Sequence, residues 1–309
     1  MKIAVCLSGF IRTWEYSKIS FIKNLLQDLD CDVFIHTYKQ NYFEHSANEK
    51  DIIYTDEEII KMFDGVNIKN VIIEDRNIIK DEIEMSSRQY ENVSNYKIKI
   101  KESSDDADNY INLGIRIYDQ LRKIHLCNEL RKEYQLENNI KYDLVVKSRF
   151  DVLYIDKIKW NTFTDDAIVY NGSGGCGGFP DDLVGIGKEY PMNAYMDRFL
   201  NLDKMCFTQV NKNSISCINW YNHHNETVFP IKEFCAHDTL LRNLIYCGCD
   251  IREGGFRNRL IRNKNQILNW GHCSINNINV QPSKITNGII VAGDNADFNV
   301  EEFNRLISL

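Results

Sequence analysis

Residues 8–12, Ser-Gly-Phe-Ile-Arg, combine residue types that suit phosphate binding and directly follow a short apolar run. A small residue and a glycine let a ligand approach the backbone, and the helix N-terminus that we expect next favours anions. Arg12 adds a side chain that can bind a phosphate at two points. A tight turn with a solvated arginine fits the same residues equally well. The absence of the G-x-G-x-x-G pattern argues against a dinucleotide site.

Arg149-Phe150-Asp151 follows a second apolar run, residues 143–146. A carboxylate at the end of a strand can hold a divalent cation that neutralises a diphosphate. Oxygen ligands suit Mg²⁺ or Mn²⁺ better than zinc, so Asp151 is a candidate ligand for one of these ions. Ion pairs of Arg149 and Asp151 with neighbouring helices are the alternative.

Two further acidic stretches lie downstream. Asp181 and Asp182 follow a glycine-rich segment at 171–178, and either carboxylate is a candidate general base for a hydroxyl acceptor. His237 and Asp238 lie at the start of an expected helix, where His237 is a candidate metal ligand and Asp238 a candidate acceptor contact. The alternatives are solvated acids at 181–182, an Asp238 that favours the helix dipole, and a hydrogen-bonded His237.

The elements that must position these residues alternate between strands and helices. Apolar runs at 2–7 and 32–38 flank a helix whose apolar residues recur every three or four positions between Ile19 and Leu29. Strand, helix and strand with short connections predict parallel pairing, and ligands bind at the carboxyl ends of such strands. Further strands are expected at 71–73, 143–146, 167–170 and 182–187, and further helices at 55–63, 108–138, 192–202 and 234–247.

Three regions carry charge without an apolar pattern. Residues 75–105 are polar and predict a long surface excursion, and the charged residues of the helix at 108–138 predict a solvated face. The stretch 252–264 is basic within an acidic chain, and such a patch suits a compact anion such as a nucleotide diphosphate, with solvated surface charge as the alternative. We find no repeat and no convincing linker, and expect one domain over residues 1–309.

Composition excludes several classes of protein. The 309 residues are 43% hydrophobic, enough for a sizeable core, and the net charge of −7 argues against a general nucleic-acid binder. No apolar stretch approaches the roughly 20 residues of a membrane span, and the N-terminal apolar run is too short for a signal peptide. The ten cysteines include no C-x-x-C pair. We therefore expect a cytoplasmic protein with reduced, structural thiols.

Five segments in order resemble a family of bacterial and viral sugar transferases of the GT-A type. SGFIRT at 8–13 is similar to the SGxxRT that follows the family's first strand, and DVFIHTY at 32–38 to its D-V-F-x-H-T-W-like second strand. YDLVVKSRFD at 142–151 is similar to its Y-D-x-V-x-x-x-R-x-D segment. Residues 181–199 resemble its acidic segment before a strand and helix, and AHDTLLRNLI at 236–245 its H-P-E-x-L-L segment. The resemblance covers residues 1–40 and 108–250.

This resemblance implies an α/β fold of the GT-A type, with a mostly parallel, Rossmann-like central sheet flanked by helices. Residues 1–155 would bind the nucleotide sugar, a UDP- or GDP-sugar, and 156–309 would form the acceptor side with an irregular C-terminal part. The acceptor would be a hydroxyl of a glycan or polysaccharide. The cofactor would be Mn²⁺ or Mg²⁺ at Asp151, and the location the host cytoplasm if the chain is viral. Carried over by position, the donor would contact Ser8, Gly9, Arg12, His36 and Thr37, the acceptor would lie near Asp181 or Asp182, and Asp238 would match the glutamate of H-P-E.

The chain departs from the wider family pattern at two positions. Arg149 stands in the first acidic position of the D-x-D motif, so this arginine can bind the diphosphate directly and make a metal dispensable. His237 stands in the proline position of H-P-E. Two other functions remain open: a catalytically silent nucleotide-binding module, and a sugar nucleotidyltransferase. The second is less favoured, because its glycine-rich loop should follow the first strand, where only Gly9 is found.

Overall fold

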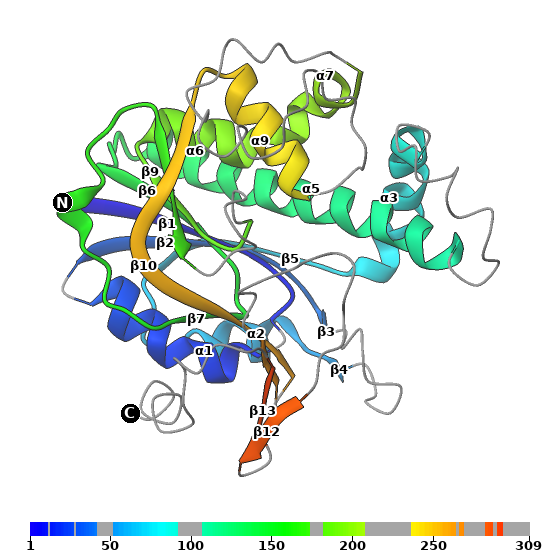
Figure 1. Cartoon of the computed structure of the whole chain (residues 1–309), viewed down its shortest axis with the longest axis horizontal. Coiled ribbons are helices and arrows are strands. Elements are labelled where there is room, and N and C mark those ends of the chain that lie inside the picture. Colours follow the sequence, from blue (N-terminus) through cyan, green and yellow to red (C-terminus); the bar gives the residue numbers. More distant parts are fainter. Residues whose placement is uncertain are drawn as a thin grey trace.

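The computed structural model describes residues 1–11, 13–27, 29–41, 52–91, 107–173, 182–207, 236–263, 266–268, 282–286 and 289–292. It contains an α/β arrangement in which helices cover a central sheet (Figure 1). The helices are α1 (Trp14–Ser20) with its π-helical continuation η1 (Phe21–Leu26), α2 (Asp56–Met62), α3 (Arg76–Glu91), α5 (Ala107–Glu137), η2 (Trp160–Thr162), α6 (Glu189–Met196), η3 (Asp197–Asn201), α7 (Leu202–Phe207) and α9 (Ala236–Tyr246). The strands are β1 (Lys2–Gly9), β2 (Asp30–Tyr38), β3 (Gln40–Asn41), β4 (Ile52–Ile53), β5 (Ile68–Glu74), β6 (Leu144–Ser148), β7 (Val152–Tyr154), β8 (Ile168–Ser173), β9 (Gly185–Gly187), β10 (Asp250–Asn263), β11 (Gln266–Leu268), β12 (Pro282–Thr286) and β13 (Ile289–Ala292).

Eleven of the described strands form one sheet, in the order β12-β13-β11-β10-β8-β9-β6-β1-β2-β5, with β7 paired to β10. The four strands β6, β1, β2 and β5 are parallel, as the expected strand–helix–strand order predicts. β3 and β4 form a separate two-stranded sheet.

The prediction of a mostly parallel sheet is wrong, because this sheet is mixed. Antiparallel pairs are as numerous as parallel pairs among its described strands. β9 lies between β6 and β8 and is antiparallel to both. Residues 174–184 join β8 to β9, and a parallel crossover needs roughly a dozen residues or more, so this connection favours an antiparallel return.

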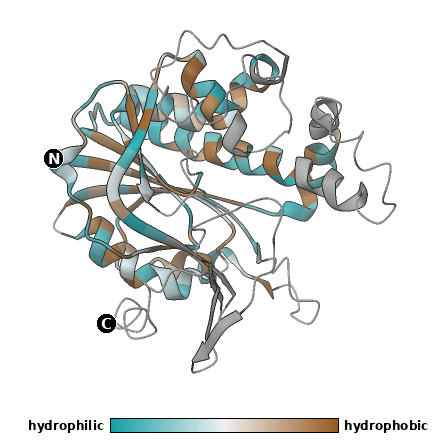
Figure 2. Ribbon diagram, viewed as in Figure 1, coloured by the Kyte–Doolittle hydropathy of each residue, from teal (hydrophilic) through white to brown (hydrophobic). Residues whose placement is uncertain are grey.

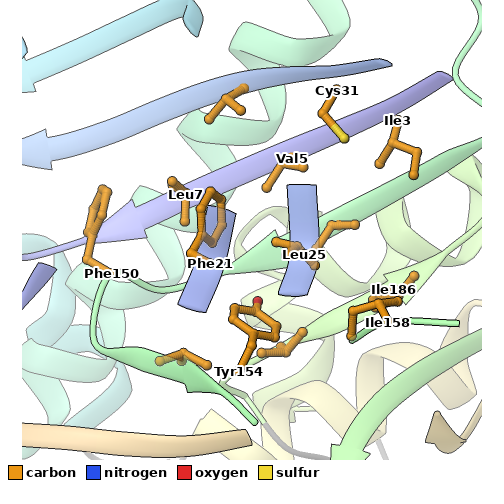
Figure 3. Close-up of a cluster of buried hydrophobic side chains, with 14 of the residues drawn as sticks. Ile3, Val5, Leu7, Phe21, Leu25, Cys31, Phe150, Tyr154, Ile158 and Ile186 are labelled. Carbon is orange, nitrogen blue, oxygen red and sulfur yellow. The ribbon is translucent and has the colours of Figure 1, made fainter. Parts of the chain in front are cut away.

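Both faces of β6, β1 and β2 are buried, which explains their largely apolar runs, whereas the edge strand β5 is partly exposed. Ile3, Val5 and Leu7 of β1 pack with Phe21 and Leu25 of η1 on one face (Figure 3). The intervening residues of β1 pack on the opposite face with α5, α6 and α9. Figure 2 shows hydrophobic residues concentrated along the central strands, whereas α5 alternates between hydrophobic and hydrophilic residues along its length.

Residues 76–91 form helix α3, so the prediction of an irregular excursion over 75–105 is wrong for this part; residues 92–106 lie outside the described part. Ile83 is buried, and α3 packs against α5. Ile78 and Met85, in contrast, are 80% and 71% exposed. These exposed apolar residues lie off the packed side of the helix and obscure its period in the sequence.

The basic stretch 252–264 belongs largely to β10, a strand that the sequence did not predict. β10 pairs in parallel with β8 and shifts register between Glu253 and Arg257. Arg257 forms a two-point ion pair with Asp156, and Arg252 lies 3.4 Å from Asp165. The positive charge at these two arginines is therefore matched by acids from other elements.

Several expected elements are confirmed within a few residues, including α5 at 107–137 and α9 at 236–246. Thr55 and Glu58 form a capping box at the start of α2, within the helix expected at 55–63. None of the described helices is long and apolar enough to cross a membrane.

The cysteines with described side chains are free thiols, and most are buried. Burial raises the pKa of Cys31 to about 12 and that of Cys249 to about 11. Cys31 and Cys249 therefore stay protonated at neutral pH, and the buried thiols pack as small apolar groups. The five thiols with described side chains are Cys6, Cys31, Cys127, Cys247 and Cys249.

Candidate functional site

The candidate site lies at the carboxyl ends of three neighbouring parallel strands. The chain passes from β1 to β2 and β5 on one side, and then returns through α5 to β6 on the other side of β1. The order in which strands are added to the sheet therefore reverses between β1 and β6, and such a switch point is where ligands bind in open α/β sheets. The register brings together Leu7 with Ser148, Ser8 with His36, and Gly9 with Thr37.

Gly9 ends β1 in a conformation that other residues rarely adopt, with φ at +134°. Its carbonyl accepts a hydrogen bond of 2.9 Å from Thr37 Oγ1, which ties the ends of β1 and β2 together. Ser8 is buried beside them. The structure thus brings together the predicted donor residues Ser8, Gly9, His36 and Thr37, whereas Arg12 lies outside the described residues.

Arg149 and Asp151 follow β6 and pair with each other. Nε of Arg149 lies 2.8 Å from Oδ1 of Asp151, and Nη2 lies 2.7 Å from Oδ2. The Asp151 side chain is 3% exposed and that of Arg149 is 18% exposed. Because both carboxylate oxygens accept from the guanidinium, the arrangement does not fit Asp151 as a metal ligand. Asp151 also belongs to no cluster of three potential ligands among the described side chains.

Asp182 is held next to the end of β6. Its backbone carbonyl accepts a hydrogen bond from the buried ammonium of Lys147, which also donates to the Leu183 carbonyl at 3.3 Å. Its carboxylate accepts from Gln120 Nε2 of α5 at 2.5 Å. The predicted acid Asp182 is therefore anchored to the end of β6 through Lys147 and to α5 through Gln120, a residue that was not singled out in the sequence.

His36 and Glu74 lie on the face of the sheet that α5 covers. His36 is fully buried, and neither ring nitrogen has a hydrogen-bond partner among the described residues. Its Nε2 lies 3.2 Å from Oε2 of Glu74, without the alignment of a hydrogen bond. Burial lowers the pKa of His36 below its ordinary value. Burial alone would raise the pKa of Glu74, but contacts with Arg122 and His36 lower it to about 2.

A buried charge network extends from this pair along α5. Asp119 accepts hydrogen bonds from Tyr38 Oη and, at 3.2 Å, from Lys123 Nζ. The Lys123 ammonium lies 4.2 Å from the Phe10 ring centre and 4.5 Å from that of Tyr38. Arg76 approaches Asp119 at 3.6 Å. Burial, followed by the charge of Asp119, raises the pKa of Tyr38.

The prediction of a solvated charged face on this helix is therefore wrong for Asp119 and Lys123, which are 2% and 4% exposed. They are buried because α5 is covered by the sheet on one side and by α3 and η3 on others. Their opposite charges at i and i+4 are the signal in the sequence that indicates such a pair.

The side chains of the remaining predicted residues are not described by the structure. Asp181 lies outside the described residues. His237 and Asp238 belong to the first turn of α9, but their side chains are likewise not described.

A second cluster could hold a metal ion, and none of its residues was predicted. Ligand atoms of His125, Glu129 and Asp197 all lie within 4.8 Å of one another. His125 and Glu129 belong to α5, and Asp197 begins η3.

The strand-end site offers a chemically mixed surface. Arg149 and the glycine turn suit an anion, and the carboxylate of Asp182 suits a hydroxyl group. No protein-family model and no curated protein matches this chain.

Proposed function

We propose that this chain is a glycosyltransferase that moves a sugar from a nucleotide-sugar donor, a UDP- or GDP-sugar, to a hydroxyl of a glycan. One observation carries the proposal. Residues that suit the donor, Ser8, Gly9 and Arg149, and one that suits the acceptor, Asp182, gather at the switch between β1 and β6. The parallel strands around them are the part of the fold that fits a GT-A arrangement.

Glycosyl transfer requires charge stabilisation on the departing diphosphate, because the diphosphate leaves with the electron pair of the broken bond while the sugar carbon develops oxocarbenium character. Arg149 is the residue that we assign to this charge, with Asp151 holding its guanidinium in place. A planar guanidinium binds two phosphate oxygens at once and keeps its charge at all working pH values.

The acceptor hydroxyl must lose a proton as it attacks. We propose that the carboxylate of Asp182 accepts this proton. Nε2 of Gln120 donates a hydrogen bond to Oδ2 of Asp182 and so orients the carboxylate. Lys147 fixes the backbone of Asp182 and is therefore a positioning residue.

Mn²⁺ or Mg²⁺ has no step in this scheme. Asp151, the acid to which the family resemblance assigns the ion, has both oxygens engaged by Arg149. We therefore propose that the arginine supplies the positive charge that the metal supplies elsewhere in the family.

The test is thermal unfolding with UDP-, GDP-, CMP- and dTDP-linked sugars, each with Mn²⁺ and with EDTA, followed by an assay of donor hydrolysis and transfer. A ligand at about 100 times its dissociation constant stabilises the folded state by roughly 2.7 kcal/mol. We expect one nucleotide class to raise the melting temperature in EDTA as well as in Mn²⁺. Binding without hydrolysis or transfer would instead indicate a silent nucleotide-binding module, and no shift with any donor would refute the proposal.

A further inference from the structure

A second set of functional groups lies away from the strand ends, at the contact between α5 and η3. α5 runs beside α6, the helix that leads into η3 (Figure 1). Nδ1 of His125 lies 3.0 Å from Oδ1 of Asp197 and 4.0 Å from Oε1 of Glu129. One imidazole nitrogen and two carboxylates from two elements thus face a common point.

A cation already lies at this point. Nζ of Lys132 lies 2.8 Å from Oε1 of Glu129 and also contacts Oδ2 of Asp197. The lysine side chain is 31% exposed, so its long stem has solvent beside it. The two carboxylates are therefore arranged around a positive charge whose carrier can move away.

Two neighbours hold the ligand atoms in this arrangement. The His125 ring stacks on Phe199, with ring centres 5.8 Å apart and planes inclined by 20°. Asn128 Nδ2 donates to Oδ1 of Asp197 at 3.0 Å. The Asp197 carboxylate thus accepts hydrogen bonds from Asn128 and Lys132 and lies against the His125 ring, which fixes its orientation.

We propose that His125, Glu129 and Asp197 form a Zn²⁺ site in which the metal ion exchanges with the ammonium of Lys132. Zinc takes nitrogen and oxygen ligands at about 2.0–2.2 Å, which sets two ligands of a tetrahedral site roughly 3.4 Å apart. The His125 distances of 3.0 and 4.0 Å bracket that separation. A rotation of the half-exposed Glu129 side chain brings in the third ligand, and water completes the tetrahedron.

The exchange needs no oxidant or reductant. Zn²⁺ binds the Nδ1 lone pair of the imidazole, whose proton is then on Nε2, and the Lys132 ammonium moves into solvent with its charge unchanged. The site therefore loses one single positive charge as one double positive charge enters. The bound ion would join α5 to η3 through three ligands.

The test is calorimetric titration of the full chain with Zn²⁺ after treatment with EDTA and desalting. The variants are His125→Gln, Lys132→Met and, as a matched control, Lys80→Met, which removes a lysine of another intrahelical pair, 3.6 Å from Glu84 on α3. We expect one equivalent of Zn²⁺ to bind the wild type and the Lys80 variant equally. Removal of the competing ammonium in Lys132→Met should tighten binding about fivefold, and loss of a ligand in His125→Gln should weaken it at least about tenfold.

Co²⁺ provides a second readout, because its absorption spectrum shows whether any of the ten cysteines of the chain binds the metal. Visible absorption without thiolate charge-transfer bands is expected in the wild type and should vanish in His125→Gln. Binding that is unchanged in His125→Gln, or that appears only in Lys132→Met, would overturn the proposal. Melting curves without metal verify that each variant is folded.

Discussion

Arg149 and Asp151 are separated by one residue and form a two-point ion pair at the end of β6, with distances of 2.8 and 2.7 Å. The carboxylate is almost fully buried, whereas the guanidinium keeps some exposure. Such a pair presents one positively charged group in a fixed orientation at the switch between β1 and β6. This orientation suits recognition of a second planar or tetrahedral anion.

Replacement of Arg149 by glutamine should lower kcat/KM for sugar transfer by about 10²–10³, the range found when one preorganised transition-state donor is removed. Asp151→Asn should cost less, because the guanidinium stays but loses its two-point partner. Steady-state kinetics in EDTA measure both effects. Arg257→Gln is the matched control, because Arg257 of β10 forms a similar two-point pair with Asp156. Equal losses in the Arg149 and Arg257 variants would contradict the assigned role.

Gly9→Ala should destabilise the fold by about 1–3 kcal/mol, because a side chain at φ +134° is strained. Space is not the cause, since an added Cβ would meet Phe150 only at 3.9 Å. Urea unfolding measures the loss. Gly65→Ala is the control, because Gly65 also has a positive φ, +85°, but lies between α2 and β5. Nucleotide binding should weaken only in the Gly9 variant, and unaffected binding in that variant would place the donor elsewhere.

The parallel half of the fold could be predicted from the sequence because β1, β2 and β6 are buried on both faces and each crossover between the parallel strands contains a helix. In the other half of the sheet, local sequence patterns predict neither the direction of β9 nor the strand β10. β9 is only three residues long, and its direction depends on pairing with β6 and β8 rather than on a local pattern. In β10 the run of arginines and the shifted register hide the strand, because acids distant in sequence, such as Asp156, neutralise the charge.

The candidate site likewise contains residues that local sequence patterns predict and contacts that they do not. Ser8, Gly9, His36 and Thr37 were predicted correctly as neighbours, because parallel strands end at one edge. The orientation of the predicted acid Asp182, however, depends on α5, because Gln120 of this helix contacts it across 62 positions of sequence. No local spacing predicts such a contact, since tertiary packing alone creates it.

Lys147→Met should lower the free energy of unfolding by about 1–3 kcal/mol, because the buried carbonyls of Asp182 and Leu183 lose a donor. If Lys147 positions Asp182, kcat should fall more than KM changes. Lys69→Met is the control, since Lys69 pairs with Asp32 at 3.4 Å near the opposite end of the parallel strands. Urea unfolding and kinetics on both variants measure the effects, and a stable, fully active Lys147 variant would exclude the positioning role.

His36→Leu should reduce the loss of stability at mildly acidic pH. Burial lowers the pKa of His36 in the folded chain, whereas the unfolded chain takes up a proton near its ordinary value of 6.5. The contribution of His36 is therefore present above pH 6.5 and is lost as pH falls toward the folded-state pKa. Glu74, with a pKa of about 2, keeps its charge throughout this range.

Urea unfolding of the wild type and the leucine variant between pH 7.5 and 5 gives the comparison. The wild type should lose more stability than the variant as pH falls below 6.5, because the unfolded chain takes up a proton that the buried His36 of the folded chain binds less readily. The other histidines cancel in this difference. The variant should also be more stable at pH 7.5, because leucine replaces a buried ring without hydrogen-bond partners among the described residues. Parallel curves for the two proteins would show that His36 binds its proton equally in the folded and unfolded chains.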